Sequence, residues 1–475
     1  MAKQKDAPKF KLLTFNLWGL KYVSHFRKER LHAVANRLAS GDDALQNDDY
    51  DIVALQEVWC QDDWDYIDRV CALRYPYRRW FSSGMISGPG LAVLSRFPIV
   101  ETFLYRYAVN GRPSAFYRGD WYVGKSAAVT ILELPGSESR VALVNSHMHA
   151  PYALTGDAAY ECHRTTQAWD LAGLTTRLKN QGYGVILVGD LNSRPGTLPH
   201  RILSSVGKLK DSWLMLHEPL PLSKIALMSP SDQVKLAGTT CDSTINTWRA
   251  YRAPTEACRL DYAFIGGDKL IAVEASVAFT ERIPGIGSYS DHFAYTATFK
   301  VADRQKLCDS RRKTPQISHK KATLDPGDAT VAVLPMDNET GSQMDENSVH
   351  NYPVTDEDPL TVCKDARITM SNYLLTTSKH QRTWRAFHFI LSMLLFIAFI
   401  PIIIVVSYRA PWASVVIYIF GCLIAVTGVV DGLISFLFGR NEQRALKEEI
   451  MQIDDKIRYT SARRNEHGEE VSHGY

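Results

Sequence analysis

Polar side chains that can bind a metal ion or move a proton follow, interrupt or precede the apolar runs of the first 300 residues. In chain order they are Asn16, Glu57, His147, His149, Asp190, Asn192, Asp261, Asp291 and His292. Ligands and catalytic groups of α/β sheets gather at the ends of strands. One such residue alone predicts little, because a polar residue after a strand is most often a turn or surface residue. Together these residues predict that six strands contribute to one crevice.

The residue types in this set suit hydrolysis of a phosphodiester. Glu57 offers the oxygen ligand that Mg²⁺ prefers, and Mg²⁺ usually takes one or two carboxylates and keeps several waters. Asp190 and Asn192 are two apart on an extended segment, which puts both side chains on one face. His292 beside Asp291 is an imidazole next to an anion, which favours its charged form. A metal ion, an imidazole base and amide donors are the groups that cleavage by water requires.

Apolar β-branched runs alternate with amphipathic segments through residues 1–300, and these elements must position the polar groups. We expect buried strands at 11–17, 51–55, 91–94, 127–134, 141–144, 185–188, 260–265 and 293–299. We expect helices at 28–38 and 161–178. This mixture predicts one large α/β domain built in layers.

The composition of the whole chain excludes several classes of protein. Its 475 residues are 45% hydrophobic and 22% charged, with a formal net charge of +3. These values exclude wholesale disorder, and the small net charge argues against a nucleic-acid partner. The eight cysteines include no Cys-x-x-Cys pair, so we expect reduced thiols on the cytosolic side. The N-terminal residues lack an apolar core, so we expect no secretory signal.

Two apolar runs stand near the C-terminus, at 386–406 and 414–438, and only Asp431 interrupts the second. Each run reaches the roughly 20 residues that a membrane-spanning helix needs. Basic residues flank the outer ends of both runs, whereas Arg409 is the one basic residue of the connecting segment 407–413. The positive-inside rule therefore predicts a hairpin of two spans with both termini in the cytoplasm. Asp431 is expected either near the interface or in a polar contact between the helices.

These runs divide the chain into four expected parts. They are a catalytic domain at 1–302, a flexible charged linker at 303–380, the two spans within 381–439, and a cytoplasmic helical tail at 440–475. The linker contains a basic block with seven Lys/Arg at 304–321 and an acidic block with nine Asp/Glu at 322–358. Such blocks are usually solvated, and a basic block near a bilayer also suits anionic lipid.

The tail carries a short apolar seam at spacings of four, three and four. Its residues are Leu446, Ile450, Ile453 and Ile457. This spacing predicts a helix that packs on a partner or on a second copy of the chain.

The segment GDWYVGKS at 119–126 has a superficial likeness to a phosphate-binding loop. The spacing of Gly119, Gly124 and Lys125 matches the pattern of that loop, and aspartate, tryptophan, tyrosine and valine fill the four positions between, but we expect no nucleotide binding there. The segment contains Asp120 and Lys125, which an ordinary ion pair in a loop would explain at under ~1 kcal/mol. Aromatic residues are frequent from 103 to 122, which suits either a face toward lipid or a packed core face.

Seven short sequence motifs resemble those of a known superfamily. In chain order they are NLW, LQEVW, GLAVLSRFPI, NSHMHA, VGDLNS, RLDY and SDH, spread over about 290 residues. The chain resembles the DNase I-like endonuclease/exonuclease/phosphatase superfamily. Its LQEVW and HMHAPY motifs and its C-terminal spans are similar to the neutral sphingomyelinases, and SAFYRGDWYVGKSAA is most similar to the fungal inositol phosphosphingolipid phospholipases C. The resemblance implies a four-layer α/β sandwich with a divalent metal, here Mg²⁺, in its cleft.

The resemblance also implies a role for each polar residue. Glu57 would be the main Mg²⁺ ligand, with Asn16 near the metal and the phosphate. Asp190 and Asn192 would orient the attacking water and the phosphoryl oxygens. By the same resemblance, His292 would be the general base with Asp291 beside it, and Asp261 would steady an imidazole. His147 would bind the phosphate or help to protonate the leaving group. Asp120 and Lys125 would form a switch that couples lipid contact to activity, and His149 fits its motif less firmly.

The expected function is therefore a membrane-anchored, Mg²⁺-dependent phospholipase C that cleaves sphingolipids to ceramide and a phosphorylated headgroup. A phosphoinositide phosphatase or a tethered nuclease of the same fold, and a membrane scaffold without catalysis, remain as alternatives. The expected partners are the sphingolipid substrate and activating anionic phospholipids, with self-association through the tail or the spans. The expected membrane is the endoplasmic reticulum or the mitochondrial outer membrane.

Overall fold

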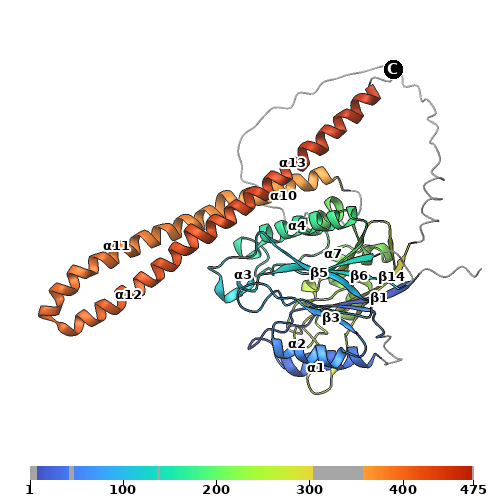
Figure 1. The fold of residues 1–475 in the computed structure, drawn as a ribbon, viewed down its shortest axis with the longest axis horizontal. Helices are drawn as coiled ribbons and strands as arrows, with labels where there is room; N and C mark the ends of the chain where they lie inside the picture. The colour runs from blue at the N-terminus through green and yellow to red at the C-terminus, as the bar shows by residue number, and fades with distance from the viewer. Residues whose placement is uncertain (1–7, 42–47, 136–139, 303–356, 473–475) are drawn as a thin grey trace, which may run out of the picture.

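The computed structural model describes residues 8–41, 48–135, 140–302 and 357–472. Two six-stranded sheets lie face to face at its centre (Figure 1). Across the first sheet the strands are β11 (Leu270–Ala278), β14 (Ala294–Val301), β1 (Lys9–Asn16), β2 (Ile52–Gln56), β4 (Ala92–Ser95) and β3 (Tyr77–Trp80). Across the second sheet they are β5 (Ile99–Arg106), β6 (Ser126–Glu133), β7 (Arg140–His147), β8 (Gly184–Asp190), β10 (Asp261–Gly266) and β9 (Leu209–Asp211). A short hairpin pairs β12 (Arg282–Ile283) with β13 (Gly287–Ser288).

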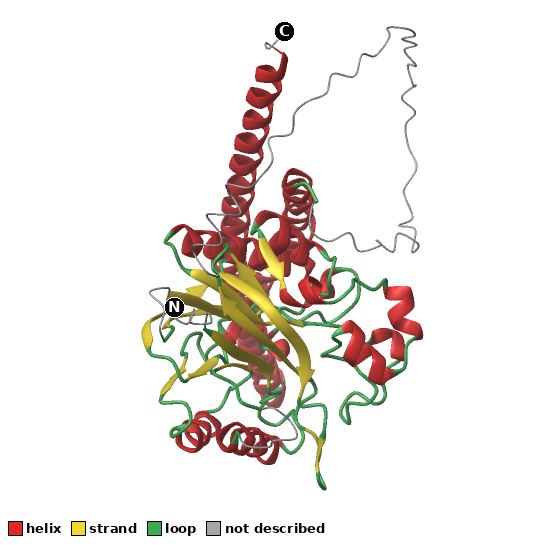
Figure 2. Cartoon of the chain, turned by 90° about the vertical axis from the view of Figure 1, so that its right-hand side faces the viewer, coloured by secondary structure: helices red, strands yellow, loops and turns green. Residues whose placement is uncertain are grey.

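Helices cover the outer face of each sheet, so that the domain has four layers (Figure 2). Helices α1 (Arg27–Ser40) and α2 (Gln61–Cys71) pack on the first sheet, and α4 (Glu161–Asn180) packs on the second. The remaining short helices are α3 (Asp120–Val123), α5 (Leu198–Arg201), α6 (Ser212–Leu216), α7 (Leu222–Leu227) and α8 (Pro230–Ala237). The predicted four-layer α/β sandwich is therefore confirmed.

The alternation of side chains along each strand explains why the sheets are buried on both faces. In β8, Ile186 and Val188 point into the core between the sheets, and Val185 and Leu187 point into the core beneath α4. A strand buried on both faces has no polar position, which is why the sequence shows a continuous apolar run there. Gly189 ends that run with φ +127°, and a Cβ at this position would lie 1.9 Å from the carbonyl oxygen of Ser146.

A helix interrupts the segment that we expected to be a flexible linker. Helix α10 (Pro359–Tyr373) begins where the side chain of Asp358 accepts from the backbone N–H of Leu360. Its Val362, Ala366 and Met370 are fully buried in the core beneath α4. The predicted linker at 303–380 is therefore too long at its C-terminal end, because an apolar stripe at helical spacing packs on the catalytic domain. Its residues 303–356, with both charged blocks almost entire, lie outside the described residues.

Two long helices form a hairpin that projects from the domain (Figure 1). Helices α11 (Lys379–Arg409) and α12 (Pro411–Leu433) are long and apolar enough to cross a membrane, and only 6% and 11% of their most apolar windows are buried. Small residues allow the two helices to approach closely, since a Cβ on Gly428 would lie 2.4 Å from the Cβ of Ser392. Asp431 makes an ion pair with Arg385 across the hairpin, so it is a polar contact between the helices.

The apolar seam of the tail packs within the chain. Helix α13 (Gly439–Ser472) lies along α10, and its Leu446 and Ile453 are fully buried in the core that α10 and α4 share. Ile450 and Ile457 pack against the same core. We expected this seam to pair with a partner or a second copy, and the structure instead uses it to hold the helical tail on the catalytic domain.

Candidate active site

Strand register brings three of the predicted residues side by side. In the parallel pair of β7 and β8, His147 is opposite Asp190. In the antiparallel pair of β8 and β10, Asp190 is opposite Asp261. Directly opposed residues of neighbouring strands have Cβ atoms about 4.5–5.5 Å apart. Residues far apart in the sequence therefore form one row at the edge of the second sheet.

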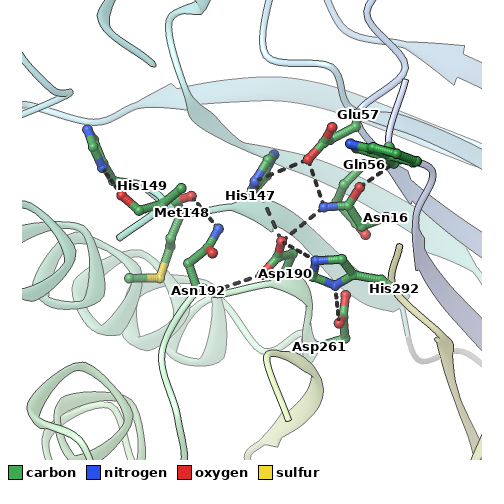
Figure 3. A network of polar contacts seen from close by, with 12 residues as sticks. Asn16, Gln56, Glu57, His147, Met148, His149, Asp190, Asn192, Asp261 and His292 are labelled. Atoms are coloured by element: carbon green, nitrogen blue, oxygen red, sulfur yellow. Dashed lines mark hydrogen bonds and ion pairs between the residues drawn. The ribbon is translucent and has the colours of Figure 1, made fainter. Parts of the chain in front are cut away.

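The first sheet contributes Asn16 and Glu57, which face this row (Figure 3). The Asn16 amide Nδ2 donates to Glu57 Oε1 at 3.0 Å and to Asp190 Oδ2 at 3.0 Å, and thereby links the two sheets. Glu57 follows β2 with φ +62°, and Asn192 follows β8 with φ +46°. A left-handed backbone at a residue other than glycine costs free energy and persists where the surrounding structure enforces it.

His292 is held by a carboxylate on its inner side. Its Nδ1 lies 2.8 Å from Asp261 Oδ2, and its Nε2 lies 3.9 Å from Asp190 Oδ2. Burial alone lowers the pKa of His292, but the charges of Asp261, Asp190 and Asp291 outweigh it and raise the pKa well above the ordinary value. The hydrogen bond fixes Nδ1 as the protonated nitrogen and leaves Nε2 toward the crevice.

Asp291, the chain neighbour of His292, has a different partner. Its Oδ2 forms an ion pair with Arg249 at 2.5 Å, and its Oδ1 accepts from the hydroxyl of Ser290 at 3.3 Å. Arg249 also lies 3.6 Å from Asp242. The structure therefore assigns the orientation of His292 to Asp261, whereas Asp291 anchors the loop that carries Arg249.

His147 is buried between the two carboxylates that Asn16 links. Its Nε2 lies 3.6 Å from Asp190 Oδ2 and 4.0 Å from Glu57 Oε1. Its Nδ1 has no hydrogen-bond partner among the described residues. Burial lowers the pKa of His147 well below the ordinary value, and the positive charges of Lys125 and His292 lower it further. A neutral imidazole with a free nitrogen can donate to an oxygen of a bound phosphate.

The donor set fits a divalent cation. Burial raises the pKa of Glu57 and the charge of Asp291 raises it further, whereas the hydrogen bond from Asn16 and the charges of Lys125 and His292 lower it. Burial also raises the pKa of Asp190 to about 6. Oxygen atoms of Asp190 and Asp261 lie within 4.8 Å of a nitrogen of His292. However, Asp261 and His292 already satisfy each other, so Glu57 and Asp190 are the carboxylates left to hold a divalent cation.

Asn16 is placed as a donor in this structure. Its amide oxygen accepts from the backbone N–H of Trp18 at 3.0 Å, and its nitrogen faces both carboxylates. The arrangement keeps Glu57 and Asp190 together, and a ligand role for Asn16 stays a prediction.

Asp120 and Lys125 form a second buried group beside the crevice. Their side chains are 7% and 3% exposed, and Lys125 Nζ lies 3.2 Å from Asp120 Oδ1. Asp120 Oδ2 accepts from the hydroxyl of Tyr152 at 2.5 Å and lies 3.6 Å from His149 Nε2. His149 stacks on Tyr160 with ring centroids 4.0 Å apart, and burial lowers its pKa to about 3. His149 is thus neutral and belongs to this second group.

The structure brings seven of the ten predicted residues to one crevice, whereas Asp291 pairs with Arg249 beside it and Asp120 and Lys125 lie behind it. Sequence reasoning missed Arg249, because a loop arginine carries no periodicity, and it missed the buried pair of Gln56 and Asn145. Gln56 Nε2 donates to Asn145 Oδ1 at 2.8 Å across the two sheets. Both residues interrupt apolar strands, and a polar residue inside a buried strand is the pattern that could have identified them.

The sequence of this chain is similar to the sequences of known proteins. Residues 13–292 match the Endonuclease/Exonuclease/phosphatase family. The chain is 44% identical over 470 residues to inositol phosphosphingolipids phospholipase C of Saccharomyces cerevisiae, covering 96% of this chain and 91% of the relative. It is 34% identical over 466 residues to the protein of the same name of Schizosaccharomyces pombe, covering 95% of each. It is 34% identical over 206 residues to sphingomyelin phosphodiesterase 2 of Mus musculus, covering 43% of this chain and 46% of the relative.

The fold, the site and these matches define a class. The chain belongs to the Endonuclease/Exonuclease/phosphatase family. More particularly, it is a hydrolase of the phosphodiesterase type, and its similarity to the two yeast proteins runs through the C-terminal helices as well as the catalytic domain.

Proposed function

We propose that this protein is a membrane-anchored, Mg²⁺-dependent phospholipase C that hydrolyses the phosphodiester of sphingolipids. The observation that supports this function most directly is the crevice itself. There Glu57 and Asp190, from different sheets, lie opposite the hydrogen-bonded pair of His292 and Asp261. The names of the yeast relatives support inositol phosphosphingolipids as substrates, and the name of the mouse relative supports sphingomyelin.

Each side chain of the crevice has its own role in the reaction. His292, when neutral, takes a proton at Nε2 from the water that attacks phosphorus, while Asp261 holds Nδ1 and stabilises the imidazolium that forms. His147 and Asn192 bind phosphoryl oxygens, since both side chains border the crevice and His147 is neutral. Asn16 keeps the two carboxylates together during the reaction.

The reaction forms one bond to phosphorus and breaks another. A bond forms between the water oxygen and phosphorus, and the bond between phosphorus and the ceramide oxygen breaks. The ceramide oxygen takes up one proton, and the headgroup leaves as a phosphate monoester. Bound Mg²⁺, held by Glu57 with Asp190 nearby, would offset the carboxylate charges and stabilise the negative charge on the phosphoryl group.

Membrane anchoring follows from the two apolar helices. The exposed apolar side chains of α11 and α12 need a bilayer around them, and an anchored enzyme searches for a lipid substrate in two dimensions. The basic residues at the outer ends of the hairpin favour a cytoplasmic catalytic domain and cytoplasmic termini. The membrane that we propose is the endoplasmic reticulum or the mitochondrial outer membrane.

Two kinds of partner fit the anchored enzyme. Anionic phospholipids would activate it. Self-association would use the exposed faces of α11 and α12, because the seam of α13 is buried within the chain.

Product analysis tests this function. The purified full chain would be incubated with labelled inositol phosphoceramide or sphingomyelin in vesicles, with Mg²⁺ or with EDTA. Ceramide and a phosphorylated headgroup in the Mg²⁺ samples alone are the expected products. Release of inorganic phosphate from a phosphoinositide instead would indicate the phosphatase alternative. Cleavage of plasmid DNA without lipid hydrolysis would indicate the nuclease alternative.

A further inference from the structure

One guanidinium is buried beside the crevice without a carboxylate partner. Arg30 of α1 is 0% exposed, and it forms no ion pair with a described residue. Burying an unpaired charge is costly, so the surrounding structure must take over the role of water around this group. Burial lowers the pKa of Arg30 to about 10, and the side chain therefore keeps its charge near neutral pH.

Backbone carbonyl oxygens take the place of a carboxylate around Arg30. The guanidinium donates through Nε, Nη1 and Nη2, at 2.8 to 3.0 Å, to the carbonyl oxygens of His25, Leu17, Tyr289 and Trp18. These four carbonyls belong to two loops that are far apart in the sequence. The planar fork of arginine suits several fixed acceptors at once, whereas the ammonium of lysine is a single point charge.

The first of these loops follows β1 and begins next to Asn16. Trp18 donates its backbone N–H to Asn16 Oδ1 at 3.0 Å, and this bond directs the Asn16 amide nitrogen at the two carboxylates of the crevice. The same loop lies directly on Glu57, since a Cβ added to Gly19 would be 2.1 Å from the carbonyl oxygen of Glu57. By holding Leu17 and Trp18, Arg30 therefore holds the side of the crevice that contributes Asn16 and Glu57.

The second loop precedes β14 and carries His292. Next to Tyr289 is Ser290, whose hydroxyl accepts from the backbone N–H of His292 at 3.3 Å and donates to the carbonyl oxygen of Asn16 at 2.7 Å. The two loops are thus joined at neighbouring positions, once through Ser290 and once through Arg30. Both joints lie within three residues of the imidazole that we assign as the base.

Two tryptophan rings pack against the guanidinium. The ring centroids of Trp18 and Trp248 lie 4.8 and 5.9 Å from the central carbon of the Arg30 guanidinium, close enough for cation–π attraction. Trp248 also donates its indole N–H to the carbonyl oxygen of Ser288 at 2.8 Å. The aromatic contacts therefore tie Arg30 to the same two loops as its hydrogen bonds do.

We propose that Arg30 is a positioning residue for the hydrolytic reaction, because its guanidinium sets the spacing between the loop that holds Asn16 beside Glu57 and the loop that carries His292. The inference rests on the phosphodiester hydrolysis proposed above. Arg30 donates to backbone carbonyls and to none of the reacting side chains in the described contacts, so it acts through the two loops. A misplacement of about 1 Å between groups that react can cost about 10²-fold in rate.

Arg30→Lys tests this role, because lysine keeps the charge but cannot donate to four carbonyls at once. The matched control is Arg37→Lys. Arg37 lies on the same helix and pairs with Asp48 and Glu281, and its contact with Tyr289 is with the ring and not with the carbonyl. Both variants of the full chain would be assayed in Mg²⁺-containing vesicles of inositol phosphoceramide or sphingomyelin, below their unfolding temperatures.

The two variants should differ in kcat. We expect Arg30→Lys to lose about 10- to 10²-fold in kcat, while the substrate mole fraction for half-maximal rate stays that of the wild type. Arg37→Lys should keep the wild-type kcat even if its unfolding temperature falls as far as that of Arg30→Lys. Equal kcat values in the two variants would overturn the inference.

Hydrogen exchange gives a second measurement that does not depend on turnover. In the full chain in lipid nanodiscs, the backbone amides of 17–26 and 289–293 should exchange faster in Arg30→Lys than in the wild type, and those of α4 should not change. Unchanged exchange in both loops would overturn the inference. Faster exchange throughout the domain would show a structural role only, and would overturn it as well.

Ser290→Ala keeps the inference testable if Arg30→Lys does not fold. It removes the other joint between the two loops, so it should lower kcat by a smaller factor and speed exchange in the same two loops. Wild-type kcat and exchange in Ser290→Ala would show that the spacing of the loops does not control the reaction. If the wild type hydrolyses neither lipid, the proposed function fails, while the exchange measurement still decides whether Arg30 joins the loops.

Discussion

Lys125 and Asn192 donate to the same acceptor, the carbonyl oxygen of Met148, at 2.8 and 3.1 Å. Asn192 borders the active-site crevice, and Lys125 belongs to the buried pair behind it. One backbone oxygen therefore joins the predicted switch to the predicted catalytic residues. This link gives the Asp120–Lys125 pair a physical route to the chemistry that neither side chain touches.

Replacing Lys125 by methionine should both destabilise the protein and slow it. The change leaves Asp120 buried without its ammonium partner, which should lower the free energy of unfolding by about 3–5 kcal/mol. Adding Asp120→Asn removes the buried charge and should restore much of that stability. Turnover should stay low in both variants, because Met148 loses the donor that holds it. Thermal unfolding in detergent and lipid turnover would be measured, and normal turnover in the double variant would contradict the proposed link.

Replacing Asp261 by asparagine should remove turnover without unfolding the domain. Asparagine can hold His292 in the wrong tautomer, and the corresponding change in a serine protease triad lowers kcat about 10⁴-fold. Asp291→Asn is the matched control, since Asp291 pairs with Arg249 and makes no hydrogen bond to the imidazole in the described contacts. Its loss of turnover should be clearly smaller. Equal losses in the two variants would show that Asp261 has no special relation to His292.

Mg²⁺ should stabilise the folded protein as well as support turnover. An ion that binds only the folded state adds about 2.7 kcal/mol at a concentration a hundred times its Kd. We therefore expect the unfolding temperature of the wild type to rise with Mg²⁺ and to fall back with EDTA. Glu57→Gln removes the main charge that would hold the ion, so its unfolding temperature should not respond. A similar rise in the variant would place the ion elsewhere.

Much of this architecture could be predicted from sequence, and the exceptions have physical causes. The strands buried on both faces, such as β1 and β8, were found because they are continuous apolar runs. Strands β5 and β11 were not, because they are edge strands with many exposed residues and a break in register, as at Ala272/Glu274. Helix α10 follows an acidic stretch, and its apolar stripe acquires meaning only against α4.

In the active site, too, some features could be predicted from the sequence and others could not. Residues at strand ends could be predicted because the fold gathers strand ends, whereas the pairing of His292 with Asp261 instead of its neighbour Asp291 depends on register between β8 and β10. Arg249 and the shared Met148 carbonyl come from loops and backbone, which carry no pattern in the sequence.

The stability of the protein should depend on pH through Glu449 of α13. Burial and, after it, the nearby Asp170 of α4 raise the pKa of Glu449 to about 9. Tyr105 donates to Asp170 at 2.7 Å on the other side. The folded state then keeps a proton that the unfolded chain releases, so stability should be greatest below the ordinary glutamate pKa and should fall as pH rises toward 9.

Glu449→Gln keeps the shape of that side chain and removes its titration. We expect the variant to match the wild type near pH 5 and to be more stable near pH 8.5 in thermal unfolding, with Glu448→Gln as an adjacent control. If the stability of the wild type instead rose between these pH values in parallel with that of the variant, Glu449 would not be protonated in the folded protein.

Glu57 and His292 are expected to act together at one crevice. The most direct test is the rate at which the full chain releases headgroup from inositol phosphoceramide or sphingomyelin in Mg²⁺-containing vesicles, compared with Glu57→Ala and His292→Ala. Each variant should unfold cooperatively and lose about 10²–10⁴-fold in turnover, as expected for loss of a general base or of the charge that holds the cation. Wild-type turnover in either variant would contradict a shared catalytic role of Glu57 and His292.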